Sequence, residues 1–294
     1  MSRMWLRKGD GHMSDTAIFY SHETENHYGR FIARPDLTGI LIPGARGKLL
    51  TKLYLTAGRE KHPVILLLHG IPGTEQNIDL AQYFRRQGFH VLVFHYSGSW
   101  GSDGDYSLKN NLEDADTVLD YIIENEQYSF DKDRIFAVGH SLGGFVCGQL
   151  IAHRREIKAG ALLMPCDIGR LPAIKKENPK LYDDLIALLD ESADWLHGTS
   201  GEALRKEAEE NADNFALETV APLLTDVPLL CFTGTLDEIT PDEICCRPMR
   251  NVIIKHGGTR LRHISYPTDH FFSDYRLTVA KDIIDFLLEQ CKNK

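Results

Sequence analysis

The 294-residue sequence lacks any apolar run close to the roughly 18 residues needed to span a bilayer. It is also short of positive charge, with 33 Lys and Arg against 42 Asp and Glu and a formal net charge of -9. Affinity for nucleic acid comes mainly from Lys and Arg, so this balance argues against a nucleic-acid partner. It also disfavours docking on anionic membranes. The sequence thus predicts neither kind of partner.

Cysteine is sparse and unpatterned. None of the six cysteines belongs to a CxxC pair or to a Cys/His spacing typical of a zinc site. The first residues carry positive charge with no apolar segment behind it, unlike a secretory signal. We therefore expect a cytoplasmic protein with reduced thiols and no cofactor. Met13 offers a second start, so the residues before it are left out of the fold prediction.

Short apolar runs alternate with helical patterns from about residue 48 onward. The run 64–68 is continuously apolar, which is typical of a strand buried on both faces of a parallel sheet. Apolar residues within 112–123 and 283–288 recur at helical spacing. This alternation predicts an α/β fold with a doubly wound, mostly parallel sheet. The expected strands cover residues 49–56, 64–69, 89–96, 134–139, 159–165, 227–233 and 261–266.

One segment breaks the alternation, because residues 167–226 contain no convincing strand. We interpret this segment as a helical cap insertion. Residues 48–166 and 227–294 would then form the core, preceded by an N-terminal extension and leading strands in residues 1–47.

The orientation of the cap follows from where it is inserted. Open α/β sheets bind ligands at the carboxyl ends of their strands, so the cap should cover that edge. We expect an apolar inner face with Leu181, Leu185, Leu188 and Phe215, and Trp195 near the substrate pocket. The alternative is that these helices pack on the side of the core and only add bulk.

The sharpest motif is the segment 139–143, which reads Gly-His-Ser-Leu-Gly. A Gly-x-Ser-x-Gly match alone carries little weight in a chain with 24 glycines. Here an apolar run precedes it and a helical pattern that opens on glycines follows. This context predicts a nucleophilic Ser141 on a sharp turn between strand and helix, with His140 in the pocket. The alternative is a glycine-rich turn around a buried serine.

A second glycine turn follows the most apolar run, where residues 69–73 read His-Gly-Ile-Pro-Gly. With both turns, the sequence resembles the α/β-hydrolase superfamily over about residues 48–290, and in it the acyl and feruloyl esterases and serine aminopeptidase-like hydrolases. In that family such a turn helps to form the oxyanion hole. The resemblance implies that the N–H groups of Ile71 and Leu142 are its donors, with His69 near the pocket. A plain Pro-Gly turn is the alternative.

A serine hydroxyl needs an adjacent base, and the order in such chains is Ser, then Asp or Glu, then His. Among the 13 histidines, His270 follows the last expected strand and precedes the last helix, which is the position the family uses. His256 and His263 fall at a helix end and in a strand, where ordinary structural roles are typical. The resemblance therefore implies that His270 is the general base.

The acid should follow the preceding strand. The sequence there reads Gly-Thr-Leu-Asp and ends at Asp237, which matches the family's G-x-x-D turn. Asp237 would hold the tautomer of the histidine and stabilise its cation. Glu238 and Asp242 are alternatives close by. Asp167 is a third, because a few family members place the acid one strand earlier.

The loop 97–107 is long and glycine-rich, and in the family this loop borders the active site. Trp100 is a candidate for the acyl or alcohol pocket, and the alternative is that it anchors the loop by packing. Asp103 and Asp105 resemble part of a cation loop. The terminal glutamate of such loops is missing, so we expect no metal there.

Three functions fit these residues. The first is a serine hydrolase that cleaves carboxylic esters of small or aromatic acyl groups. The second is an aminopeptidase, thioesterase or lactonase on the same triad, and the acidic residues of the cap keep the aminopeptidase open. The third is a non-catalytic binding protein of the same fold, which usually lacks a triad member, whereas none is missing here. The sequence does not decide the substrate or the formation of a homo-oligomer.

Overall fold

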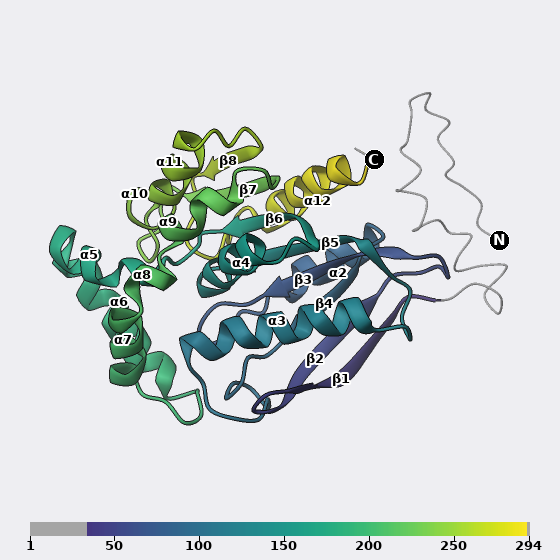
Figure 1. Ribbon diagram of the computed structural model, residues 1–294, viewed down its shortest axis with the longest axis horizontal. Helices are drawn as coiled ribbons and strands as arrows, with labels where there is room; N and C mark the ends of the chain where they lie inside the picture. Colours follow the sequence, from purple (N-terminus) through teal and green to yellow (C-terminus); the bar gives the residue numbers. More distant parts are fainter. Residues whose placement is uncertain (1–33, 293–294) are drawn as a thin grey trace.

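The computed structural model describes residues 34–292, which form an α/β structure around an eight-stranded sheet (Figure 1). The strand order is β1-β2-β4-β3-β5-β6-β7-β8. β2 pairs antiparallel with β1 and with β4, and the other pairs are parallel. The strands are β1 (Asp36–Gly44), β2 (Gly47–Leu55), β3 (His62–Leu68), β4 (His90–Phe94), β5 (Phe130–His140), β6 (Ile157–Leu163), β7 (Leu229–Gly234) and β8 (Leu261–Tyr266).

The prediction of a doubly wound, mostly parallel sheet is confirmed. Each of the seven expected strands overlaps one of β2 to β8. β1 lies within residues 1–47, for which the sequence predicts leading strands without bounds. Residues 1–33 of that segment, including Met13, lie outside the described residues.

Helices cover both faces of the sheet, which explains the continuously apolar run in β3. Along this strand Val64 and Leu66 belong to one apolar core, whereas Ile65 and Leu67 belong to the other. The first core includes residues of α3 (Leu108–Glu124), α4 (Leu142–His153) and α11 (Arg247–Lys255), and the second includes residues of α2 (Ile78–Arg86) and α12 (Arg276–Lys292). A short helix, α10 (Asp242–Cys245), precedes α11.

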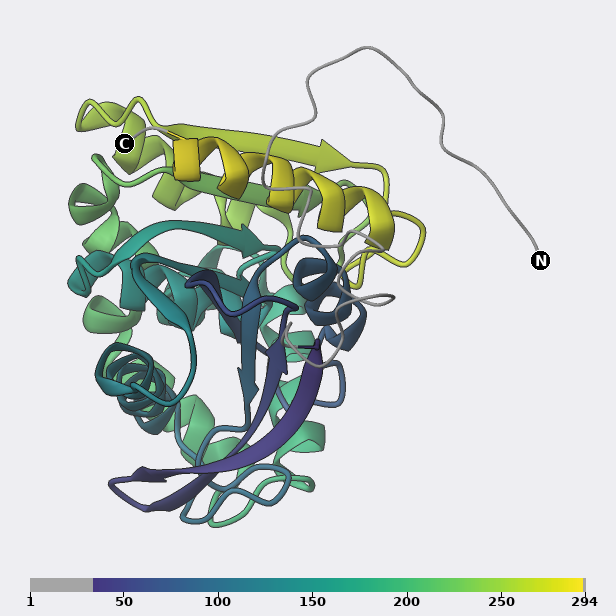
Figure 2. The ribbon, with the colours of Figure 1, turned by 90° about the vertical axis from the view of Figure 1, so that its right-hand side faces the viewer.

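β1 and β2 form a long hairpin at one edge of the sheet, opposite β8 (Figure 2). The turn of this hairpin lies against the loop 97–107. The N–H of Lys48 donates to the Asp103 carboxylate at 2.8 Å, and a Cβ on Gly47 would lie 2.4 Å from the Asp103 Cβ.

None of the helices within residues 34–292 combines the length and the apolar character that a membrane-spanning helix needs.

The segment 167–226 folds into short helices, and α5 to α8 gather beyond one end of the sheet (Figure 1). Leu181, Leu185 and Phe215 are buried there. The expectation that Trp195 points inward is wrong, because its side chain is 62% exposed. The segment holds η2 (Ile168–Arg170), α5 (Leu171–Glu177), α6 (Pro179–Ala193), α7 (Gly201–Glu210), α8 (Ala212–Phe215), α9 (Leu217–Val220) and η3 (Ala221–Leu224). Its division from the core as a cap stays our interpretation.

The fold buries several histidines in the neutral form, and this predicts acid sensitivity. Burial lowers the pKa of His69 to about 4 and those of His90, His95 and His140 to about 3. An unfolded histidine has a pKa of about 6.5, so below that pH the unfolded chain binds more protons than the folded one. The contribution of these neutral histidines to the free energy of unfolding is therefore complete at neutral pH. It is lost as the pH falls from about 6.5 toward the pKa values of the folded state. At pH 5 each of these histidines lowers the free energy of unfolding by roughly 2 kcal/mol.

Urea unfolding followed by circular dichroism from pH 7.5 to pH 4.5 measures this loss. His90→Gln should flatten the pH dependence, whereas His256→Gln, at an exposed position, should leave it unchanged. Asp167 acts in the opposite direction, because burial raises the pKa of its carboxyl to about 7, but one group does not offset four. A free energy of unfolding that stays constant from pH 7 to pH 5 would contradict the prediction.

Candidate active site

Ser141 lies on a strained turn between β5 and α4, with φ 58° and ψ -125°. This is a backbone conformation that residues other than glycine rarely adopt. Hydrogen bonds hold it in place, because the Ser141 N–H donates to the Leu163 carbonyl at 2.9 Å. The Ser141 carbonyl accepts the N–H groups of Gly144 at 2.8 Å and Cys166 at 2.9 Å. The arrangement is that of a nucleophile elbow, as the motif predicts.

Close backbone contacts explain the glycines on both sides of the turn. A Cβ on Gly139 would lie 2.0 Å from the Gly143 carbonyl oxygen, and one on Gly143 would lie 2.2 Å from that of Leu68. Neither position accepts a side chain without a shift of backbone. The same holds at Gly70, where a Cβ would lie 2.9 Å from the Ser141 Cβ. No separate role for Gly70 was predicted from the sequence, although this contact brings the second glycine turn next to Ser141.

His270 and Asp237 are joined by a buried hydrogen bond. The His270 Nδ1 lies 2.9 Å from the Asp237 Oδ2. Burial raises the pKa of the Asp237 carboxyl, but the hydrogen bonds from His270 and Thr240 outweigh it and leave the pKa below its usual value. Asp237 is therefore a carboxylate at neutral pH. His270 donates from Nδ1 to it, which leaves Nε2 as the acceptor nitrogen.

Asp237 is itself held by the residues that follow it. Its Oδ1 accepts the N–H groups of Ile239 at 2.8 Å and Thr240 at 2.9 Å, and its Oδ2 accepts the Thr240 hydroxyl at 2.7 Å. Thr240 was not among the residues predicted from the sequence. An Asp followed three residues later by Thr is the signal that could have found it, because Asp side chains often bind the N–H groups just after them.

The alternative acids lie elsewhere. The Asp242 carboxylate binds the Arg250 guanidinium at 2.6 Å, and the Glu238 side chain is exposed. Both oxygens of the buried Asp167 lie 3.1 Å from the Leu217 N–H. Among the described residues, Asp237 is the carboxylate that hydrogen-bonds to His270.

Ser141 and His270 open into one cavity of about 160 Å³. Ile71, whose N–H the resemblance assigns to the oxyanion hole, also lines it, and Leu142 opens α4 directly after Ser141. Leu188 of α6, in the segment 167–226, forms part of the cavity wall. The full lining is Gly70, Ile71, Pro72, Gly73, Thr74, Glu75, His140, Ser141, Leu188, Ile239, His270 and Phe271.

The pocket residues expected from the sequence separate into two groups. His140 lines the cavity, and its Nε2 donates to the His270 carbonyl at 2.8 Å. His69, Trp100 and Trp195 do not line it, which corrects their expected positions. His69 is 1% exposed because its Nδ1 turns inward to donate to the Gly70 carbonyl at 2.7 Å. Trp100 and Trp195 instead stack on each other outside the cavity, with ring centroids 5.7 Å apart.

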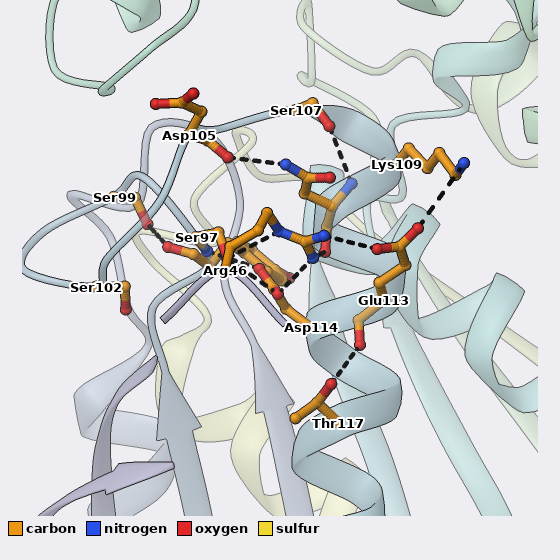
Figure 3. A network of polar contacts seen from close by, with 12 residues as sticks. Arg46, Ser97, Ser99, Ser102, Asp105, Ser107, Lys109, Glu113, Asp114 and Thr117 are labelled. Atoms are coloured by element: carbon orange, nitrogen blue, oxygen red, sulfur yellow. Dashed lines mark hydrogen bonds and ion pairs between the residues drawn. The ribbon is translucent and has the colours of Figure 1, made fainter. Parts of the chain in front are cut away.

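A polar network holds the start of the loop 97–107 (Figure 3). The Arg46 guanidinium lies 2.9 Å from Asp114 and 2.7 Å from Glu113, both on α3. Asp114 is 1% exposed, and its carboxylate accepts the Ser97 N–H at 2.6 Å and the Ser97 hydroxyl at 3.0 Å. A buried carboxylate needs such partners, so the network fixes the loop relative to the sheet. Arg46 and Asp114 are far apart in sequence, and no sequence motif predicts that they form an ion pair.

The two aspartates of this loop bind other residues of the chain. Asp103 accepts the Lys48 N–H, and Asp105 pairs with His197 at 2.9 Å. Among residues 34–292 no group of three or more His, Cys, Asp or Glu side chains is placed to hold a metal ion.

Relatives by sequence match part of the chain. A family model described as the alpha/beta hydrolase fold matches residues 63–185. Lysophosphatidylserine lipase ABHD12 of Bos taurus is 30% identical over 131 residues, which are 43% of this chain and 32% of that protein. A multifunctional-autoprocessing repeats-in-toxin protein of Vibrio vulnificus is 29% identical over 124 residues, 40% of this chain and 2% of the toxin. The chain thus matches about a third or less of the length of these relatives.

Solved structures share the fold over most of the chain. An esterase of Pyrococcus furiosus has a TM-score of 0.66 at 15% identity, covering 87% of this chain and 91% of its own. Est1E of Butyrivibrio proteoclasticus has a TM-score of 0.63 at 22% identity, covering 86% and 98%. An acylaminoacyl peptidase of Pyrococcus horikoshii has a TM-score of 0.68 at 15% identity, covering 91% and 43%. With this sheet order, elbow and family match, the chain has the alpha/beta hydrolase fold.

Proposed function

We propose that this chain is a serine hydrolase that cleaves carboxylic esters of small or aromatic acyl groups. One observation carries the proposal. Ser141 and His270 line the same cavity, and Asp237 is hydrogen-bonded to the His270 nitrogen that Ser141 does not need. A nucleophile, a base and an orienting acid in this order match the requirements of acyl transfer.

In the proposed acylation step, the Ser141 Oγ attacks the ester carbonyl while the His270 Nε2 takes the hydroxyl proton. Asp237 stabilises the resulting imidazolium and stays ionised. The N–H groups of Ile71 and Leu142 stabilise the oxyanion. His270 then gives its proton to the departing alcohol. Water attacks the acyl-enzyme with the same histidine as base, which releases the acid and restores Ser141.

The size of the cavity is consistent with an acyl group of modest size. Its volume is about 160 Å³, and Leu188, Ile239 and Phe271 give it apolar walls. Apolar walls around a few polar groups are typical of small-molecule sites. One of the structural neighbours, Est1E, has been solved with ferulic acid bound, which is an aromatic acid. This supports aromatic acyl esters among the candidates.

An adjoining cavity favours uncharged or cationic groups on the other part of the substrate. It has a volume of about 260 Å³ and shares Leu188 and Ile239 with the first. Asp184, Glu191 and Glu238 line it, and no Lys or Arg is among the described residues that line either cavity. The same carboxylates support the second candidate, an aminopeptidase that would hold a free amine.

The charge of the adjoining cavity predicts a substrate preference. For esters of one acid with alcohols of similar size, we expect kcat/KM at low salt to be roughly tenfold higher for neutral or cationic alcohols than for an anionic one. The difference should shrink at high salt, because exposed charges are screened. Glu238→Gln should reduce the difference, whereas Glu126→Gln, at an exposed residue just after the end of α3, should not. Equal kcat/KM for all three charges would contradict the prediction.

A fluorophosphonate probe tests the function directly. We expect stoichiometric labelling of Ser141, located by mass spectrometry of the labelled peptide. A panel of p-nitrophenyl esters of rising chain length and of aromatic acyl esters then identifies the preferred acyl group. Labelling at another residue, or turnover of amides but not of esters, would contradict the proposed ester hydrolase.

A further inference from the structure

Two tryptophans lie beside the catalytic cavity without lining it. Trp100, in the loop 97–107, has a backbone φ of 46°, a value that residues other than glycine rarely adopt. Such a conformation persists only where the surroundings determine it, and it is frequent near functional sites. The contacts of Trp100 on its two sides therefore indicate what this conformation is for.

On one side, Trp100 holds the glycine turn that faces Ser141. Its indole N–H donates to the Pro72 carbonyl at 2.6 Å. A Cβ on Gly73 would lie 2.6 Å from the His69 ring and 3.1 Å from the Trp100 Nε1. The turn therefore has both the His69 ring and the Trp100 indole as close neighbours. Ile71, the proposed oxyanion donor, is the residue just before Pro72.

On the other side, Trp100 is held by the insertion. The Trp195 ring stacks on it at 5.7 Å with an interplanar angle of 21°. The backbone next to Trp195 runs antiparallel to the loop. The His197 N–H donates to the Gly98 carbonyl at 2.8 Å, and the Tyr106 N–H donates to the His197 carbonyl at 2.9 Å. Ser99 also forms a bridge with Leu196. We call residues 195–197 the strap.

The strap directly follows α6, the helix whose Leu188 forms a wall of the catalytic cavity. One helix therefore contacts the substrate space through Leu188 and is tied through Trp195 and Trp100 to the turn opposite Ser141. A stack of two rings and one hydrogen bond therefore links the end of α6 to the turn.

We propose that Trp100 is a positioning residue that makes the geometry of the oxyanion turn depend on the docking of the cap. The inference rests on the proposed function, in which Ile71 is an oxyanion donor. Trp195 keeps Trp100 in its strained conformation, and Trp100 keeps the Ile71–Gly73 turn aimed at the reacting carbonyl. The strap thus adjusts the chemical step without touching the substrate.

The test uses the full chain with Trp100→Phe, which keeps the ring stack and removes the N–H donor. We expect kcat for a p-nitrophenyl ester to fall roughly tenfold or more with little change in KM, because misplacement of an oxyanion donor weakens the transition state alone. Inhibition by a trifluoromethyl ketone, whose adduct carries an oxyanion, should weaken by the same factor. A merely structural role would leave this inhibitor affinity unchanged.

The partner variants test the coupling. Trp195→Ala should lower kcat in the same way, and Trp195→Phe should retain it, because phenylalanine keeps an aromatic ring in the stack. In the Trp100→Phe background, Trp195→Ala should add little, since the two act in series. Leu277→Ala, at a residue 75% exposed and remote from the strap in sequence, is the surface control.

Two results with the variants would overturn the inference while leaving the proposed function intact. The first is wild-type kcat and inhibitor affinity in Trp100→Phe, and the second is losses from the two substitutions that simply multiply. If circular dichroism shows that Trp100→Phe is unfolded, the comparison of Trp195→Ala with Trp195→Phe decides alone. No ester turnover by the wild type would overturn the proposed function and this inference with it. Normal wild-type turnover with unaffected variants would overturn only the inference.

Discussion

A Ser141→Ala variant is expected to fold normally and to lose roughly 10³-fold or more in kcat, because the members of a triad act as a unit. The fold should survive because the bonds that fix the turn come from the Ser141 backbone, whose N–H and carbonyl bind Leu163, Gly144 and Cys166. The substitution removes only the hydroxyl. Initial rates on p-nitrophenyl esters measure the loss, and circular dichroism checks the fold.

This variant needs a control for contamination, because traces of another esterase can imitate residual activity. Active-site titration with the fluorophosphonate probe counts functional serines in each preparation. Ser141→Ala should bind no probe, and Ser273→Ala, at an exposed serine near His270, should bind it like the wild type. Full esterase activity in unlabelled Ser141→Ala would refute the assignment of the nucleophile.

Asp237→Asn should lower kcat by about 10⁴-fold with little change in KM. In the wild type the Asp237 carboxylate accepts a hydrogen bond from the His270 Nδ1 at 2.9 Å. An amide that presents its NH₂ group there favours the tautomer with the proton on Nε2, which then cannot take the proton of Ser141. Steady-state kinetics on the best ester of the panel measures the effect.

Two matched variants separate Asp237 from its rivals. Glu238→Gln changes the exposed neighbour, and Asp167→Asn changes the buried carboxylate that accepts the Leu217 N–H. Both should retain kcat for a neutral ester within a few-fold. Asp167→Asn should also be more stable than the wild type above pH 7, because it removes a buried group whose folded pKa is raised to about 7. Loss of turnover in Asp167→Asn with an active Asp237→Asn would reassign the acid.

The sheet was predictable because its signals are local. The run 64–68 is apolar at every position, which is typical of a strand covered on both faces of the sheet. The elbow was predictable for a similar reason, because a buried strand, two close glycines and a helix adjoin in sequence. β1 gave a weaker signal, since residues such as Leu37 and Leu41 on this edge strand are exposed.

Contacts between distant segments were not predictable from the sequence. The inward turn of His69 depends on the Gly70 carbonyl and on the Tyr96 ring, whose centroid is 4.7 Å away. The exposed position of Trp195 depends on Trp100, in a loop nearly a hundred residues earlier. A single sequence carries no record of such pairs, because each partner alone reads as an ordinary aromatic residue.

The two ends of the segment 167–226 contact each other, which bears on how far this segment can vary. The Asp167 carboxylate at its beginning binds the Leu217 N–H near its end, and a Cβ on Gly169 would lie 2.1 Å from the Ala216 nitrogen. Residues 167–169 and 216–217 are therefore in contact, and insertions are tolerated best where the two ends of a segment lie close together. A segment whose ends meet in this way can change in length while the strands and the Ser141 turn stay in place. Its contacts with the cavity through Leu188 and with Trp100 through Trp195 would change with it.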